Sequence, residues 1–271
     1  MENVTWTISG ASAITLKSAR RNSGKWPNPC GTLLSGQRMK KESGFFMWTT
    51  DRQPYSPKKR ILIVSFGMGN LLSVSSALSH LGASFFVSSE GRDFPEADAF
   101  ILPGVGAFGT AMENLQKQHL IAPLTREVME KGKPCLGICL GMQLFAKDSC
   151  EMGFHRGLGW LDAHVLPLEP EGLPVPHVGW NDIRIHRKDP FFSTLDDGTN
   201  FYFDHSLHLL CSKEMVSAIC DYGGPVIAAI QHKNLMAAQF HPEKSQRNGL
   251  KLLRNFLNFI EDKSPVETPS C

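Results

Sequence analysis

The chain has 271 residues, of which 42% are hydrophobic and 20% charged, with 28 basic and 26 acidic side chains. This balance indicates a globular protein and excludes a polar, disordered one. The longest uncharged stretch near the middle, residues 99–112, is interrupted by one proline and three glycines. It is shorter than the ~20 apolar residues of a membrane-spanning helix, so no transmembrane segment is predicted.

Charge is distributed unevenly along the chain. Residues 1–60 hold 11 basic and 3 acidic side chains, and the remainder holds 17 and 23. An acidic body repels polyanions, which disfavours a nucleic-acid partner. The 7 cysteines are odd in number and irregularly spaced, which argues against a disulfide framework. A reducing compartment, the cytoplasm, is therefore expected.

The N-terminal and C-terminal segments differ from the body in texture. Residues 1–59 show no sustained apolar period and are predicted to be a basic, disordered extension. An upstream start codon, with Met39 or Met47 as the true first residue, is one alternative. An organellar transit peptide, which would change the compartment, is the other. Residues 60–261 are predicted to form one domain, followed by a disordered tail over residues 262–271.

The body begins with alternating strand and helix patterns. Short apolar runs predict strands at residues 61–64, 85–87, 99–102 and 135–138, and apolar residues at helical spacing predict helices at 71–81, 111–119 and 121–131. This order predicts a doubly wound, mostly parallel α/β sheet of the flavodoxin-like kind.

Beyond residue 157 the predicted strands follow one another closely. The β-rich segments are residues 163–166, 182–186, 200–203, 216–220, 226–230 and 236–240. They are predicted to extend the same sheet with antiparallel strands. A closing helix is predicted at about residues 248–260, with its apolar residues on one face.

A cysteine lies where a strand turns sharply into a helix. The segment Gly137-Ile138-Cys139-Leu140-Gly141 follows an apolar strand and has the pattern G-x-C-x-G. Glycines beside the nucleophile leave room for a sharp turn that projects its side chain from the end of the sheet. A buried structural cysteine in a glycine-rich turn would give the same local pattern.

A second segment supplies the proton chemistry that a cysteine nucleophile needs. His241 and Glu243 follow the apolar strand at residues 235–238. The imidazole could act as acid and base, and the carboxylate could fix its tautomer and support its cation. Because the chain has 10 histidines, His241 alone would be weak evidence, and its position at a strand end strengthens the prediction.

The glycine-rich loops allow more than one interpretation. Backbone N–H groups of Gly104, Val105 and Gly106, with that of Leu140, could form an oxyanion hole. The same loop could hold a phosphate, but it lacks the Gly-Lys-Ser/Thr ending of a phosphate loop. Residues 67–70 suggest a dinucleotide fingerprint without its third glycine. Neither a cofactor nor a metal is therefore expected.

Six motifs occur together in a recognisable order. They are Gly67 to Leu71 with Ser73-Val74, Pro103 to Phe108, Gly137 to Gln143, Pro176 to Asn181, Phe201 to Phe203 with His205-Ser206, and Gln239 to Ser245. Together they resemble the class I glutamine amidotransferases over about residues 60–260. Within that class they are most similar to the glutaminase subunit of imidazole glycerol phosphate synthase. The resemblance implies a Cys139, His241 and Glu243 triad.

The resemblance also implies a substrate pocket and a partner. Glutamine would be held by Gln143, Glu151, His205 and Ser206. The released ammonia would pass to a (β/α)₈ cyclase subunit that makes imidazole glycerol phosphate and AICAR in histidine biosynthesis, within a heterodimer. The residues implied at that interface are Asn70, Trp180, Asn181, Tyr202 and Lys244.

The sequence departs from the family pattern at Ser65, Asp204 and Leu207, which touch the glutamine pocket and the cyclase-facing side. Three other functions are alternatives. The same glutaminase could feed a partner that forms an aminosugar, or the chain could be a non-catalytic paralogue that only docks. A general cysteine hydrolase leaves the motifs around Gln143 and His205 unexplained.

Overall fold

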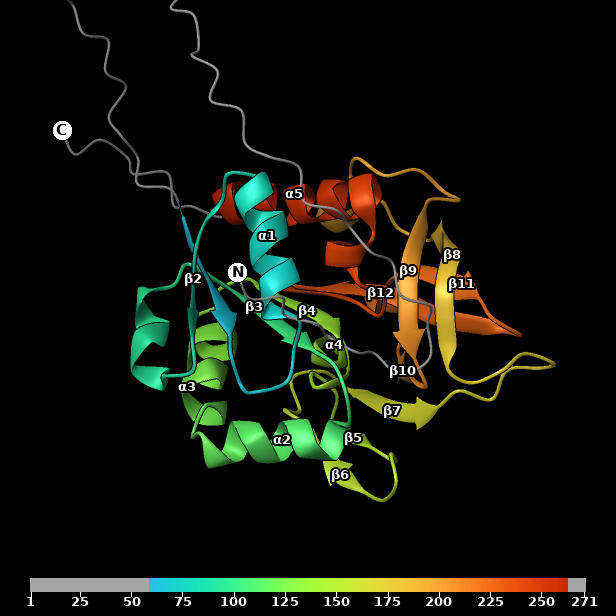
Figure 1. Ribbon diagram of the computed structural model, residues 1–271, viewed down its shortest axis with the longest axis horizontal. Coiled ribbons are helices and arrows are strands. Elements are labelled where there is room, and N and C mark those ends of the chain that lie inside the picture. Colours follow the sequence, from blue (N-terminus) through green and yellow to red (C-terminus); the bar gives the residue numbers. More distant parts are fainter. Residues whose placement is uncertain (1–58, 263–271) are drawn as a thin grey trace, which may run out of the picture. The chain divides into compact units, whose positions relative to one another are not determined.

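The computed structural model describes residues 59–262 (Figure 1). The predicted extension, apart from its last residue, and the C-terminal tail, apart from its first, lie outside this range. Within the described range, no helix is both long enough and apolar enough to cross a membrane.

The described chain alternates helices and strands in its first half and is mainly β-structured in its second. The strands are β1 (Arg60–Val64), β2 (Ser84–Ser88), β3 (Ala99–Gly104), β4 (Cys135–Cys139), β5 (Asp148–Ser149), β6 (His155–Arg156), β7 (Ala163–Pro167), β8 (His177–Ile185), β9 (Asn200–His205), β10 (Leu207–Cys211), β11 (Val216–Asp221), β12 (Pro225–His232) and β13 (Leu235–Ala238). The α-helices are α1 (Leu71–His80), α2 (Phe108–Lys117), α3 (Ile121–Thr125), α4 (Leu140–Gln143) and α5 (Gln246–Asp262). Short helical turns are η1 (Gly91–Glu96), the π-helical η2 (Arg126–Glu130), η3 (Pro190–Phe192), η4 (Lys213–Met215) and η5 (Pro242–Lys244).

A sheet of nine strands forms the centre of the domain, in the order β2-β1-β3-β4-β13-β12-β11-β8-β9. The strands from β2 to β13 are parallel to their neighbours, and those from β12 onward are antiparallel. Because parallel strands are covered on both faces, they are continuous apolar runs, as in Ile61 to Val64 of β1. The predicted doubly wound class is confirmed.

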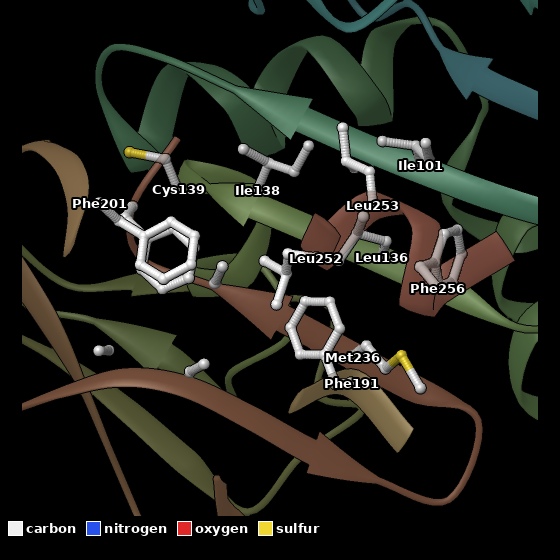
Figure 2. Packing of buried hydrophobic residues seen from close by; sticks show 14 of the residues in the cluster. Ile101, Leu136, Ile138, Cys139, Phe191, Phe201, Met236, Leu252, Leu253 and Phe256 are labelled. Carbon is white, nitrogen blue, oxygen red and sulfur yellow. The ribbon is translucent and has the colours of Figure 1, made fainter. Parts of the chain in front are cut away.

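Two hydrophobic cores lie on opposite faces of this sheet. Successive side chains of β1 alternate between them: Ile61 and Ile63 pack with α1 and α5, and Leu62 and Val64 pack with α2 and α3. Figure 2 shows the first core, where Leu252, Leu253 and Phe256 of α5 pack with side chains of the central strands. These cores hold the ends of β3, β4 and β13 in fixed register.

The second half departs from the prediction in two places. The predicted strand at 236–240 is β13, at residues 235–238, and it pairs parallel with β4. The predicted strand at 163–166 is β7, which lies in a separate sheet of order β10-β7-β5-β6. That sheet includes three short strands, β5, β6 and β10, that the apolar pattern did not reveal. Apolar periodicity indicates that a segment is extended and does not identify its neighbour.

The helix ends follow the local sequence. Asn70 caps α1 by accepting a hydrogen bond from the Ser73 N–H at 3.2 Å. Gly82, with φ of 70°, follows the end of the same helix, in the left-handed conformation that glycine commonly supplies after a helix. The closing helix is longer than predicted and runs from residue 246 to 262.

Candidate active site

Cys139 lies at the junction of β4 and α4 in a strained backbone conformation. Its φ is 53° and its ψ is −110°, a region that residues with a Cβ rarely occupy. In the sheet register it is paired with Gly104 on the neighbouring strand β3. The side chain is 5% exposed. The structure therefore shows the sharp strand-to-helix turn that the G-x-C-x-G pattern predicts.

The glycines around this turn are required by close backbone approach. A Cβ on Gly141 would collide with the carbonyl oxygen of Leu102. A Cβ on Gly104 would lie 2.8 Å from Cβ of Leu140 and 3.0 Å from the Gly141 nitrogen. The turn and the end of β3 are thus packed backbone against backbone, so larger side chains would push them apart.

His241 and Glu243 form a buried pair beyond the end of β13. The Nδ1 atom of His241 lies 2.8 Å from Oε1 of Glu243, and both side chains are 2% exposed. The backbone N–H of His241 donates to the Tyr202 carbonyl at 2.9 Å, which ties this segment to β9. The Glu243 bond leaves Nε2 as the ring atom available for proton transfer, and Nε2 is buried with no hydrogen-bond partner among the described residues.

The pKa of His241 is raised to about 10. Burial opposes the cation and by itself lowers the pKa, but interactions with Cys139 and Glu243 outweigh it. The structure therefore places an imidazole beside the cysteine in an environment that favours its protonated form. A cation at this position can support negative charge on the sulfur and can give a proton to a leaving group.

Two further groups contact the sulfur of Cys139, and the sequence analysis assigned neither of them a role. The Gln239 Nε2 donates to Sγ at 3.6 Å, and Sγ lies 3.8 Å from the Asp204 carbonyl oxygen. A signal for Gln239 was present, because it is a polar residue next to the fully buried strand β13. No sequence signal marks a backbone carbonyl such as that of Asp204.

The predicted glutamine-binding residues lie on three segments of the chain. Gln143, on α4, uses both amide protons, donating to the Leu207 carbonyl at 3.1 Å and to Oε1 of Gln239 at 2.9 Å. Its Oε1 remains to accept a hydrogen bond. The Glu151 carboxylate accepts from the Phe108 N–H at the start of α2. Ser206 is exposed at the point where β9 leads into β10.

The predicted oxyanion loop follows β3 beside the cysteine turn. Gly104 is buried, Val105 is 39% exposed, and Gly106 has a φ of 96°. Leu140 is the first residue of α4, where backbone N–H groups have no partner within the helix. The structure thus brings both predicted sources of N–H groups to one end of the sheet.

Four of the five predicted interface residues gather on β8, β9 and η5. Trp180 is 48% exposed and meets the Tyr202 ring edge-on at 6.2 Å. The Lys244 ammonium lies 5.4 Å from the centre of the Tyr202 ring and 3.8 Å from the Asp204 carboxylate. Asn181 donates to the Asp221 carbonyl. The fifth, Asn70, caps α1 as described above.

The described residues contain no group of three or more His, Cys, Asp or Glu side chains placed to hold a metal ion. The chemistry that this arrangement offers is a buried cysteine beside an imidazole whose protonated form is favoured, next to the glycine-rich loop that follows β3. This arrangement suits attack on a carbonyl carbon, with the imidazole moving protons.

Comparisons with known proteins identify the family. A family model described as "Glutamine amidotransferase class-I" matches residues 62–259. Among solved structures, a glutamine amidotransferase superposes with a TM-score of 0.59 at 20% identity, covering 74% of this chain and 98% of that one. The structure of PurLQS from Thermotoga maritima has a TM-score of 0.61 at 19% identity, covering 75% and 99%. At these identities the structural likeness shows the fold.

Comparison with curated relatives shows which family within this class the chain resembles. HisH 2, a subunit of imidazole glycerol phosphate synthase from Vibrio vulnificus, is 44% identical over 204 residues, which is 74% of this chain and 95% of that protein. The HisH subunits of Aquifex aeolicus and Moorella thermoacetica are 46% and 47% identical, and the matches cover 73% and 72% of this chain and 95% and 93% of those proteins. The chain belongs to the class I glutamine amidotransferases and, within them, to the HisH family of imidazole glycerol phosphate synthase subunits.

Proposed function

We propose that the chain is a glutaminase that hydrolyses glutamine and delivers ammonia to a cyclase partner. The observation that carries this proposal is the convergence of Cys139 and the buried His241–Glu243 pair at the ends of β4 and β13. Family membership supplies the substrate, since the family's printed name is that of an enzyme acting on glutamine.

The first half of the reaction forms a thioester. The Cys139 thiolate attacks the side-chain carboxamide carbon of glutamine, and N–H groups of Leu140 and the Gly104–Gly106 loop stabilise the oxyanion. The carbon–nitrogen bond then breaks, and protonated His241 gives its proton to the departing nitrogen, which leaves as ammonia. Glu243 keeps the imidazole oriented throughout by its bond to Nδ1.

The second half regenerates the cysteine. His241, now neutral, accepts a proton from water as the water oxygen attacks the thioester carbon. The carbon–sulfur bond breaks, and glutamate leaves with the oxygen of the water. Gln143, Glu151, His205 and Ser206 are assigned to glutamine binding. The net reaction converts glutamine and water to glutamate and ammonia.

Ammonia released into water at neutral pH is protonated and ceases to be a nucleophile, so it must pass directly to an acceptor. The names of the relatives make the acceptor a second subunit of imidazole glycerol phosphate synthase. We infer a heterodimer with a (β/α)₈ cyclase that makes imidazole glycerol phosphate and AICAR in histidine biosynthesis. The cluster of Trp180, Tyr202 and Lys244, with Asn181 and Asn70, is assigned to that interface.

We further propose that residues 60–261 are the amidotransferase domain and that the protein works in the cytoplasm. Residues 1–59 and 262–271 are proposed to lie outside the domain. Fusion of residues 1–59 to a fluorescent protein tests the alternative of an organellar address. A diffuse cytoplasmic signal supports the proposal, and a signal confined to an organelle contradicts it.

The function is tested by measuring glutamate release from glutamine by the full chain. The chain is assayed alone and with an imidazole glycerol phosphate synthase cyclase subunit and its ribonucleotide substrate, with Cys139→Ala as the blank. We expect strong activation only in the complete mixture. Hydrolysis at the same rate with and without the cyclase would support the glutaminase chemistry and would indicate an aminosugar-forming partner instead. Equal rates with and without Cys139 would contradict the glutaminase itself.

A further inference from the structure

Gln239 is a fully buried polar residue for which the proposed triad chemistry has no role. It lies immediately after β13 and two residues before His241. Its Nε2 donates to Sγ of Cys139 at 3.6 Å, and its Oε1 accepts from Nε2 of Gln143 at 2.9 Å. The carboxamide therefore bridges the cysteine and helix α4.

The direction of this bridge is fixed by hydrogen-bond chemistry. The Nε2 of Gln143 also donates to the Leu207 carbonyl at 3.1 Å, and a carbonyl oxygen can only accept. The amide end of Gln143 must therefore face both Leu207 and Gln239. Since the oxygen of Gln239 receives that bond, its nitrogen faces the sulfur. A flipped carboxamide would set two N–H groups against each other.

The Leu207 carbonyl is itself held by a buried chain of histidines. Nδ1 of His205 donates to it at 2.8 Å, and Nε2 of His205 accepts from Nδ1 of His177 at 2.9 Å. The His177 ring is stacked on Tyr222, with ring centres 3.9 Å apart, and on Phe203 at 4.6 Å. Asn181 Nδ2 contacts the far nitrogen of His177 at 3.2 Å.

The two histidines are neutral at physiological pH, so each has one donor and one acceptor. Burial lowers the pKa of His177 to about 4 and that of His205 to about 3. Every hydrogen bond in this series therefore has one donor-to-acceptor direction, from Asn181 through His177 and His205 to Leu207. An unbroken series of hydrogen bonds thus connects β8 to the sulfur of Cys139.

We propose that Gln239 is a positioning residue for Cys139. The Leu207 carbonyl, acting through Gln143, fixes the direction in which the Gln239 N–H points, and His205 and His177 hold that carbonyl in place. This inference rests on the proposed function, in which Cys139 is the nucleophile. An N–H group that donates to a thiolate is a charge-assisted donor, and it restricts the sulfur to one position. Because the Cys139 backbone is strained, a hydrogen bond from Gln239 to the sulfur helps to keep the side chain aligned for attack.

The test compares two replacements of Gln239 with a matched control. Gln239→Met keeps the length and the burial and removes the donor. Gln239→Glu retains an oxygen that accepts from Gln143 and replaces the donor by a carboxylate. Gln231→Met is the control, because Gln231 lies on the adjacent strand β12 and its side-chain oxygen accepts from the Phe191 N–H, away from the sulfur.

The primary readout is the rate at which iodoacetamide alkylates Cys139 in the full chain, across a range of pH. Peptide mass spectrometry separates Cys139 from the other cysteines, of which Cys150 is exposed. This measurement needs no turnover. Glutaminase kcat and KM are measured in parallel, with Cys139→Ala as the blank.

We expect Gln239→Met to slow alkylation at pH 7 by about tenfold and to move the rate profile to higher pH. The kcat should fall by a similar factor, with KM changed by less than about twofold. Alkylation of Cys139 should be slowed at least as much in Gln239→Glu, although this variant keeps the bond to Gln143. If Gln239 had only a structural role, this variant would instead keep the wild-type alkylation rate. Gln231→Met should match the wild type.

The series of hydrogen bonds that leads from His177 to Gln239 is tested with His177→Phe, which keeps the aromatic stack and removes both hydrogen bonds of the ring. We expect alkylation of Cys139 to slow by about threefold, in the same direction as for Gln239→Met. An unchanged rate would overturn the role of the histidines.

Wild-type alkylation rates in both Gln239 variants would overturn the positioning role, while an inactive Cys139→Ala would leave the glutaminase proposal standing. Equal glutamate release by wild type and Cys139→Ala would instead contradict the glutaminase proposal, and the alkylation comparison would still be readable.

Discussion

Oε1 of Glu243 lies 2.8 Å from Nδ1 of His241, and the two side chains are almost completely shielded from water. Burial disfavours the imidazolium, but contacts with Cys139 and Glu243 raise the pKa of His241 to about 10, against an ordinary value of 6.5. Since the folded value lies above the unfolded one, the stabilisation from this cation is present below about pH 6.5. It is lost as the pH rises through about 10.

This environment predicts that the His241 ring does not titrate between pH 6 and 8. Nitrogen NMR of labelled histidine measures the protonation directly. In Glu243→Gln the midpoint should fall below that of the wild type, because the carboxylate no longer supports the cation while the interaction with Cys139 remains. A midpoint that stays near 10 in that variant would contradict the assigned role of Glu243.

Strain at Cys139 makes a second prediction. Cys139→Ala removes the sulfur but keeps a Cβ at a φ of 53°, whereas Cys139→Gly relieves the backbone. We expect the glycine variant to be more stable than the alanine variant by about 1 kcal/mol, measured by urea unfolding. Both variants should lack glutaminase activity. Equal stability would show that the turn carries no strain.

The contact between the oxyanion loop and α4 is tested with Gly104→Ala. The added methyl group would lie 2.8 Å from Cβ of Leu140, so it must push the end of β3 away from the cysteine turn. We expect kcat for glutamine to fall by about 100-fold, the scale of losing an oxyanion donor. Val105→Ala, which trims a partly exposed side chain of the same loop, should change kcat by less than about threefold. Similar losses in both variants would contradict this contact model.

Far from the site, Glu127 makes a stability prediction. Its carboxylate is completely buried and lies 2.8 Å from the Lys131 ammonium and 2.7 Å from that of Lys133. Burial alone would raise the pKa of Glu127, but the two ammonium groups lower it from 4.5 to about 2. This stabilisation is complete above about pH 4.5 and is lost as the pH falls through 2.

Glu127→Gln should therefore lower the free energy of unfolding by about 2–3 kcal/mol at pH 7 and by less than half of that at pH 3. Glu113→Gln is the matched control, because its pairing with Lys117 at 3.0 Å is exposed. That change should cost less than about 1 kcal/mol. Urea unfolding at both pH values makes the comparison, and equal losses in the two variants would contradict it.

The proposed interface is tested with Trp180→Ala. Trp180 is half exposed and packs against Tyr202, as anchoring aromatic side chains of interfaces do. Titration calorimetry with the cyclase subunit should show affinity weakened by about 30-fold. Met129→Ala removes a side chain that is 40% exposed on η2 and should leave the affinity unchanged. Unchanged binding by Trp180→Ala would move the interface elsewhere.

The parallel half of the fold could be predicted because each of its strands is an apolar run between glycines and helical periods. The elbow could be predicted as well, since Gly137 and Gly141 leave a visible spacing around Cys139. The helix boundaries were less exact: α5 begins at residue 246, because its first turn carries no apolar residue to mark it.

The second sheet could not be predicted, because β5 and β6 have only two residues each and β10 follows β9 after one residue. β7 pairs with the distant strand β10, Ala163 with Cys211, and alternation along one segment does not identify its partner. The contacts of the Cys139 sulfur could not be predicted either. Gln239 stands in a recognised motif, but only the folded register places its amide beside the sulfur of Cys139.

The connection between β9 and β10 is a single residue, and its length is constrained by the strands on either side. β9 is hydrogen-bonded into the nine-stranded sheet as far as His205, and β10 into the four-stranded sheet from Leu207, so Ser206 is the one residue between strands of two different sheets. An inserted residue would reverse the side-chain alternation of one strand relative to the other. Divergence in this family can therefore exchange side chains along residues 200–211, whereas a change of length would break the register of one of the two sheets.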